Sequence, residues 1–372
     1  MNVAEGYTYD GSVIAFTQTA DVSLKIVVSQ GTSTITGTGG IRVESTTGNA
    51  SLSIKGSGSL DVEPKGSNSG ITLCSSKNVN LDIDGADVTA SSPSLYGVYL
   101  LSYTATSTST ITVNNGSLTT GGNGNVGIYY YWSGTNNAGT SSLTVSGNAV
   151  VDTRNSQIMA QNKETVVQVG AGSDGNGGIV FNGKNGTVYG DVTLQEDLEI
   201  GEGESLTIED EASLNTGSHK LIVNGGTLNG ADKITGTVKY APVITTESLP
   251  DGTVGKSYSD TSLAATGDTP ITWSVSNGSL PAGLGLSEDG KITGTPTTEG
   301  TSTFTITATN TAGSDSKEFS LTIKPVPVTG VKLDKTELSL YTGESALLNA
   351  TVEPDNATNK TVTWSSDKLD VA

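Results

Sequence analysis

The sequence is poor in the residues that most often carry cross-links or metal chemistry. Its 372 residues include one cysteine, Cys74, and one histidine, His219. A single cysteine excludes an intrachain disulfide, and this pair cannot supply the ligands of an ordinary zinc site. The two residues lie far apart in the chain, so a catalytic Cys–His pair is not expected. We interpret Cys74 as a small packing residue.

Positive charge is also scarce, with 19 Lys and Arg against 38 Asp and Glu and a net charge of −19. No Lys/Arg cluster interrupts the negative charge, so phosphate backbones and anionic lipid would repel the chain. No run of about 18 apolar residues is present to span a bilayer. We therefore expect no nucleic-acid partner and no membrane insertion of this segment.

Aromatic residues make up only 5% of the chain and charged residues only 15%, whereas 48 residues are glycine. Apolar residues still reach 34% and often alternate with polar ones, which is typical of strands separated by many turns. The composition predicts an all-β protein, and the length allows two or three domains.

The chain repeats itself four times between residues 40 and 150, at a period of about 30 residues. Each copy holds a glycine with an apolar pair, a second apolar pair and a third apolar anchor. The glycines are Gly40, Gly70, Gly97 and Gly127, and the third anchors are Leu60, Val88, Leu118 and Val150. Three short strands per copy predict the rungs of a β-solenoid.

We assign residues 1–240 to this solenoid. Because side chains alternate along a strand, Arg42, Thr72, Tyr99 and Tyr129 point away from the apolar core. The regularity lapses between about 154 and 185, where residues 170–178 suggest a longer loop. Shorter apolar segments resume at Val192.

Residues 241–325 differ in sequence pattern from the solenoid, and their pattern predicts a β-sandwich of short strands. Residues 242–324 resemble the Ig-like domain, related to cadherin-like modules, that occurs in tandem on bacterial surface proteins. The matching strings are Leu249–Gly255, Ile271–Val275, Gly278–Leu284, Gly290–Pro296 and Ala308–Gly313.

A proline-rich linker leads into residues 328–372, which look like the first half of a group 2 bacterial Ig-like domain. The strings that carry this resemblance are Val331–Lys335, Leu338–Glu344, Ala350–Pro354 and Val362–Ser366. The later strands of that family are not represented, so we expect a partial domain. Both resemblances imply extracellular spacer or adhesion modules without catalytic motifs.

The solenoid itself is similar to right-handed β-helix segments described as carbohydrate-binding in secreted proteins of gut bacteria. Together these features predict an all-β fold: a right-handed parallel β-helix (β-solenoid) followed by Ig-like β-sandwich domains. We further expect a piece of an exported protein, located extracellularly at a cell surface or secreted, whose signal and anchor are not in this sequence.

The densest aromatic cluster is Tyr129–Trp132, with further tyrosines one rung earlier. We predict ligand contacts from Tyr99, Tyr129, Tyr131 and Trp132, because exposed rings suit the apolar faces of sugars and phenol groups can bond sugar hydroxyls. Strict alternation sends Trp132 inward unless the strand has already turned. The alternative interpretation is that these rings only shield or pack against the solenoid.

Carboxylates concentrate at Asp82, Asp84 and Asp87, with Asp61 one rung before. Paired carboxylates serve glycoside hydrolysis, and several could hold Ca²⁺ in a lyase. The neighbouring rungs place Ser53, Thr112 and Thr144 beside Asp82, so we favour a solvated turn. The acidic run at residues 196–211 alternates with apolar residues and is interpreted as a solvated face that could at most associate weakly with Ca²⁺. We expect no cofactor, no metal site and no catalytic residue.

The resulting hypothesis is a non-catalytic surface or adhesion protein. Its β-helix would recognise a glycan or a host or other extracellular protein ligand, while the Ig-like modules act as spacers. Two alternatives stay open: a polysaccharide lyase or glycosidase on the β-helix, and a purely structural stalk.

Overall fold

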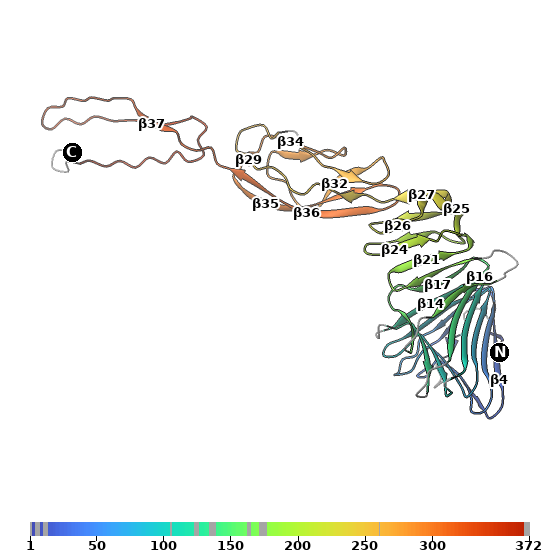
Figure 1. Cartoon of the computed structure of the whole chain (residues 1–372). Helices are drawn as coiled ribbons and strands as arrows, with labels where there is room; N and C mark the ends of the chain where they lie inside the picture. The colour runs from blue at the N-terminus through green and yellow to red at the C-terminus, as the bar shows by residue number, and fades with distance from the viewer. Residues whose placement is uncertain are drawn as a thin grey trace. The chain divides into compact units, whose positions relative to one another are not determined.

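Strands of the repeat pair in parallel with their counterparts one copy away, which generates a coil of stacked rungs (Figure 1). The computed structural model describes residues 2–3, 8–9, 14–104, 106–122, 126–133, 139–161, 165–170, 177–259 and 261–367. Within these residues the chain is built from strands, with one turn of 3-10 helix at Ala231–Lys233. It divides into two compact units, Met1–Val238 and Lys239–Ala372.

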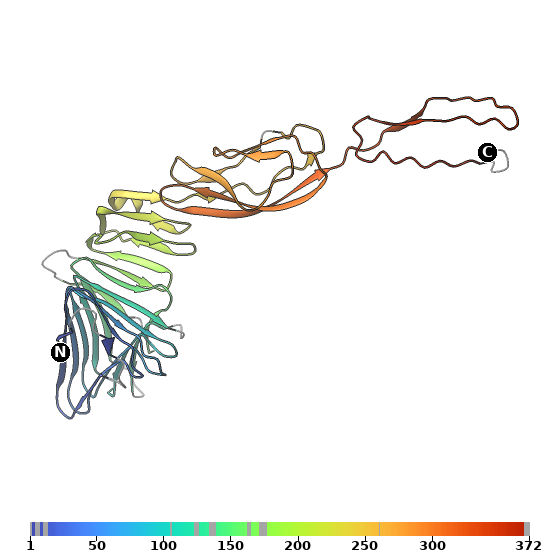
Figure 2. The same ribbon diagram turned by 180° about the vertical axis from the view of Figure 1, so that it is seen from behind.

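Successive solenoid strands belong in turn to three sheets, which Figure 2 shows from behind. Sheet A contains β1 (Asn2–Val3), β4 (Val22–Val28), β7 (Ala50–Gly56), β10 (Val79–Asp84), β13 (Thr108–Asn114), β16 (Thr140–Ser146) and β19 (Val166–Val169). Sheet B contains β2 (Thr8–Tyr9), β5 (Thr32–Ile35), β8 (Ser59–Val62), β11 (Asp87–Ser92), β14 (Ser117–Gly122), β17 (Ala149–Thr153), β20 (Gly178–Asn182), β21 (Asn185–Tyr189), β24 (Ser205–Ile208) and β26 (Thr227–Asn229). Sheet C contains β3 (Ile14–Gln18), β6 (Ile41–Ser45), β9 (Ile71–Ser75), β12 (Val98–Ser102), β15 (Ile128–Trp132) and β18 (Ile158–Ala160).

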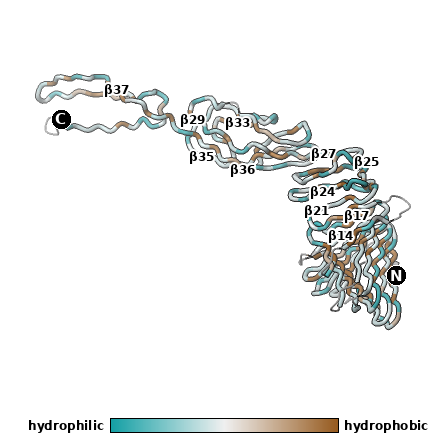
Figure 3. Tube along the Cα trace, viewed as in Figure 1, coloured by the Kyte–Doolittle hydropathy of each residue, from teal (hydrophilic) through white to brown (hydrophobic). Residues whose placement is uncertain are grey.

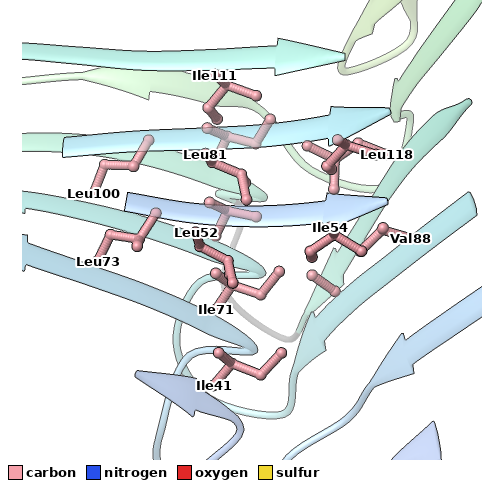
Figure 4. Close-up of a cluster of buried hydrophobic side chains, with 14 of the residues drawn as sticks. Ile41, Leu52, Ile54, Ile71, Leu73, Leu81, Val88, Leu100, Ile111 and Leu118 are labelled. Carbon is pink, nitrogen blue, oxygen red and sulfur yellow. The ribbon is translucent and has the colours of Figure 1, made fainter. Parts of the chain in front are cut away.

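The core consists of apolar columns that run across the strands. In sheet A, Leu81 pairs with Leu52 on one side and Ile111 on the other, and none is more than 1% exposed. Side chains of sheets B and C meet this column, as Val88 and Leu73 show in Figure 4. Buried and outward residues alternate along β7 and β10, and Figure 3 shows apolar and polar stretches interspersed along the solenoid. The predicted solenoid is thereby confirmed.

One anchor predicted from the repeat is wrong. Leu118 pairs with Val151 in β17, whereas Val150 pairs with the outward Ser117. Val151 is fully buried and Val150 is only half-buried. Ser146 of β16 pairs with Asn114 and Val150 pairs with Ser117, so the chain has one more residue between these two positions than in the preceding rung. This extra residue shifts the face of the following strand by one position.

The coil does not stay parallel throughout. Strands β20 and β21 form an antiparallel hairpin, with Gly183 in its two-residue loop at a φ of 60°, a conformation that glycine adopts without strain. A further sheet, sheet D, then forms from β22 (Asp191–Thr193), β23 (Leu198–Ile200), β25 (Ser213–Val223) and β27 (Ile234–Tyr240). These rungs have their own apolar core, which includes Phe181 and Leu206.

The second unit begins with a sandwich of short and long strands around Trp273, Phe304 and Phe319. Its strands are β28 (Val243–Ile244), β29 (Gly252–Thr253), β30 (Thr261–Ser262), β31 (Ala265–Thr266), β32 (Thr272–Gly278), β33 (Leu284–Leu286), β34 (Lys291–Gly294), β35 (Gly300–Thr309) and β36 (Ser314–Lys324). The longest pairing is the antiparallel hairpin of β35 and β36.

The remainder of the second unit contains one antiparallel pair, β37 (Gly330–Leu333) and β38 (Ala350–Glu353), within the residues that the structure describes. Apolar side chains of this segment are largely exposed, as Tyr341 at 85% and Leu347 at 74% show. The segment therefore lacks the enclosed core that the preceding sandwich possesses.

Candidate ligand-binding surface

Parallel pairing brings equivalent outward residues of sheet C side by side. Tyr99 of β12 pairs with Tyr129 of β15 on one side and with Thr72 of β9 on the other. The rings of Tyr99 and Tyr129 lie almost parallel, with centroids 5.9 Å and planes 9° apart. This spacing follows from strands that lie about 4.8 Å apart, and it falls within the range in which aromatic pairs attract each other.

Two further rings extend this pair. Tyr96, in the turn before β12, lies 5.1 Å from Tyr99 and 4.8 Å from Tyr129 between ring centroids. Tyr131 lies 6.4 Å from Tyr99 and 6.1 Å from Tyr129. All four side chains are half-buried, so each keeps part of its surface in solvent. We refer to Tyr96, Tyr99, Tyr129 and Tyr131 as the tyrosine patch.

Trp132, the fourth predicted contact residue, points into the solenoid and is fully buried. Its indole Nε1–H donates a hydrogen bond to the carbonyl oxygen of Ser107 at 3.2 Å. Its backbone N–H donates to Oε1 of Gln161 at 3.1 Å. The strand keeps its alternation through this residue, so the ring of Trp132 belongs to the core and lies apart from the tyrosine patch.

The phenol groups of Tyr99 and Tyr129 are neutral at physiological pH. Partial burial raises the pKa of Tyr99 to about 12, and the neighbouring phenol of Tyr96 adds to this effect. Burial also raises the pKa of Tyr129. A neutral phenol can both donate and accept hydrogen bonds, which is the polar chemistry that the patch presents beside its ring surfaces.

A charged group lies on β6, which is separated from the patch strand β12 by β9. Arg42 donates from Nε and Nη2 to Oε2 of Glu44, at 3.2 and 3.0 Å. The hydroxyl of Tyr103 donates to the other oxygen of the same carboxylate at 2.9 Å. Cys74 lies in an outward position but is fully buried, and burial raises the pKa of its thiol.

The carboxylates singled out in the sequence do not gather beside the tyrosines. Asp82 and Asp84 lie on sheet A, where both contact Nζ of Lys55, at 3.3 and 3.2 Å. Asp61 and Asp87 lie on β8 and β11 of sheet B. Asp84 also accepts a hydrogen bond from Asn114, and Asp87 accepts one from Ser117. Asp82, Asp84 and Asp87 are thus engaged with neighbouring side chains.

The acidic run at residues 196–211 is similarly distributed among separate partners. Glu204 lies 3.4 Å from Arg154, Asp197 lies 3.6 Å from His219, and Asp210 lies 2.8 Å from Lys233. Among the described residues, no group of three or more His, Cys, Asp or Glu side chains is placed to hold a metal ion. Residues 171–176 of the predicted loop lie outside the described residues.

Tyr96 was not among the predicted contact residues, although it makes the closest ring contacts of the patch. It precedes the strand, so strand alternation says nothing about its direction. Its only sequence signal is its position three residues before Tyr99.

In the part of the chain that the structure describes, no helix has the length and apolar character needed to cross a membrane.

Comparison with known proteins confirms the two Ig-like resemblances. Residues 236–324 match the family described as Putative Ig domain, and residues 327–372 match the family Bacterial Ig-like domain (group 2). The chain is 37% identical over 134 residues to an Ig-like virion protein of Serratia phage KSP90, covering 34% of this chain. This chain covers 49% of that relative's length.

Solved structures with detectable likeness include a putative alpha-galactosidase from Bacteroides fragilis, at 26% identity and a TM-score of 0.21. That match covers 23% of this chain and 19% of the other. The extracellular domains 3–5 of Drosophila OTK match at 18% identity and a TM-score of 0.20, over 24% of this chain and 34% of the other.

Proposed function

We propose that this chain is a non-catalytic protein of an exposed surface, whose solenoid recognises a glycan at the tyrosine patch. The observation that carries the proposal is the set of four half-exposed phenols on one outward face of sheet C. Such rings combine apolar surface with hydroxyl groups, as sugars do. The Ig-like modules act as spacers.

The surface location is supported by the two Ig-like family matches and by the likeness to an Ig-like virion protein. The chain spans about half the length of that relative, so the role of the whole protein is part of the proposal. An acidic chain of this composition suits the surface of a cell as well as the surface of a virus particle.

Charge near the patch favours a neutral ligand. Arg42, on β6 two strands from Tyr99, is already bound by the carboxylate of Glu44, and the phenols of Tyr99 and Tyr129 carry no charge at physiological pH. The net charge of −19 opposes the approach of an anionic polymer. We therefore expect neutral glycans to bind better than acidic polysaccharides or nucleic acids.

A glycan array probed with the full chain and with Tyr129→Ala tests the proposal. We expect binding of at least one neutral glycan, and loss of about tenfold or more in affinity when Tyr129 is removed. Tyr240→Ala is the matched control, since Tyr240 is also exposed but lies outside the patch. Absence of binding by the unaltered chain, or equal binding by all three proteins, would overturn the proposal.

A structural stalk is the second candidate, and the mutual packing of the four rings favours it. Rings that contact each other shield sheet C from water even without a ligand. In this case Tyr129→Ala would lower the stability of the solenoid but would leave every glycan-array signal unchanged. The two candidates are therefore separated by measuring stability and binding on the same variant.

A further inference from the structure

A polar depression lies on the outer face of sheet A. A depression with a volume of about 340 Å³ crosses the first residues of β4, β7 and β10. Its polar lining consists of Asp21, Ser23, Asn49, Ser51, Asn78 and Asn80. We refer to it as the amide groove. Its volume lies near the lower end of the range of ligand pockets, roughly 300–1,000 Å³.

Hydrogen bonds between equivalent residues of successive rungs fix part of the lining. Oδ1 of Asp21 accepts from the backbone N–H of Asn49 at 2.7 Å. Oδ1 of Asn49 accepts from the backbone N–H of Asn78 at 3.1 Å, and Oδ1 of Asn78 accepts from Thr108 at 2.9 Å. These bonds hold the side chains in fixed orientations, so the groove is preorganised.

The same bonds leave other polar atoms of the groove without partners. Within the described residues, no hydrogen bond is made by the hydroxyls of Ser23 and Ser51 or by the side-chain NH₂ groups of Asn78 and Asn80. Oδ2 of Asp21 is also without a partner there. The groove thus presents amide and hydroxyl donors beside carboxylate and hydroxyl acceptors.

This set of groups discriminates between classes of ligand. An anion would meet Asp21, whose pKa is lowered by the hydrogen bond from the Asn49 backbone, so that the carboxylate stays ionised. A metal ion would find one carboxylate. An extended peptide has no free strand edge to pair with, because β7 is already bonded to β4 and β10. A neutral polyhydroxyl compound can satisfy both the donors and the acceptors.

We propose that the amide groove is a second carbohydrate site, which binds a short stretch of a neutral glycan through hydrogen bonds to Ser51, Asn80 and Asp21. It lies on sheet A in the rungs of β4, β7 and β10, whereas the tyrosine patch lies on sheet C in the rungs of β12 and β15. The proposal rests on the groove alone and does not require the tyrosine patch to bind a ligand.

Affinity gel electrophoresis of the full chain in glucomannan, galactomannan, arabinoxylan or dextran tests this site. Ser51→Gln fills the groove, and Ser142→Gln is the matched control. Ser142 occupies the same outward column three strands further along, through the pairs Ser51–Asn80, Asn80–Thr110 and Thr110–Ser142. We expect at least one polymer to retard the chain, and Ser51→Gln to weaken this retardation about tenfold while Ser142→Gln does not.

Tyr129→Ala separates this proposal from the previous one. A polymer bound in the groove still retards Tyr129→Ala, whereas a polymer bound only at the tyrosine patch no longer does. The amide groove is not a carbohydrate site if no polymer retards the unaltered chain. The same conclusion follows if Ser51→Gln and Ser142→Gln behave alike, or if only Tyr129→Ala loses retardation.

Discussion

The guanidinium group of Arg154 lies over the ring of Phe181, with its Cζ 4.8 Å from the ring centroid. Arg154 follows β17, and Phe181 is a fully buried residue of β20. The guanidinium also donates to Asp152 at 2.8 Å and to the backbone carbonyl of Glu199 at 2.9 Å. Because Glu199 belongs to β23, this side chain connects the parallel sheets to the C-terminal rungs.

We predict that Arg154→Lys lowers the free energy of unfolding of the solenoid by about 1–3 kcal/mol. Lysine keeps the charge but loses the planar fork that reaches Asp152 and Glu199 together. Arg42→Lys is the control, because within the residues that the structure describes Arg42 forms an ion pair only with the partly exposed Glu44, so this variant should lose less than about 1 kcal/mol. Denaturant unfolding followed by circular dichroism measures both, and equal losses would contradict the prediction.

Gly40→Ala should destabilise the solenoid by about 2 kcal/mol or more. Gly40 has a φ of 62°, and an added Cβ would overlap the carbonyl oxygen of Gly70 on the next rung. Gly121→Ala is the control, since among the described residues its Cβ would meet only Ser91, at an ordinary 3.9 Å. Thermal unfolding of the two variants should separate them clearly. A Gly121→Ala protein as unstable as Gly40→Ala would disprove this account of rung stacking.

Cys74 should react slowly with a thiol reagent in the folded protein. It is fully buried under a covering that includes Tyr103, and burial raises the pKa of the thiol, which disfavours the reactive thiolate. Tyr103→Ala is expected to speed the reaction at least roughly tenfold, equivalent to about 1.4 kcal/mol of local opening. Tyr240→Ala should leave the rate unchanged. Fast labelling of the unaltered chain would show that Cys74 is accessible.

Alkaline pH should weaken the packing around Tyr99. Burial raises its pKa from 10 to about 12, so the folded chain holds the phenol proton more tightly than the unfolded chain. The corresponding stability is fully present below pH 10 and is lost as the pH rises toward 12. Tyr99→Phe should remove one late-titrating phenolate from the absorbance titration and flatten the loss of stability over this window. An unchanged titration curve would refute the assignment.

Much of the solenoid follows from local sequence pattern. Alternation along a strand decides which residues face inward, and the repeat length decides which residues are neighbours on adjacent rungs. For this reason the stacking of Tyr99 under Tyr129 could be predicted, and the register of β12 and β15 confirms it. The same alternation anticipated that Trp132 would point inward unless the strand had turned, and its burial shows that the strand continues.

Features that depend on turns were less accessible to sequence reasoning. One extra residue between the paired positions of β16 and β17 moves the buried position from Val150 to Val151, because alternation is counted from the start of each strand. The antiparallel hairpin of β20 and β21 was also not predicted. Its short apolar strands resemble those of a parallel rung, and only the pairing partner distinguishes the two arrangements.

The sequence by itself determined an all-β chain with a solenoid and Ig-like modules, because apolar periodicity and recurrent motifs are local properties. Only the tertiary structure decided which side chains meet across rungs: Tyr96 against Tyr129, Arg154 over Phe181, and the residues of the amide groove. These contacts depend on the direction that the chain takes at the turn after each strand. Small differences in turn length and backbone conformation set these directions. The apolar periodicity of the sequence carries no information about such differences.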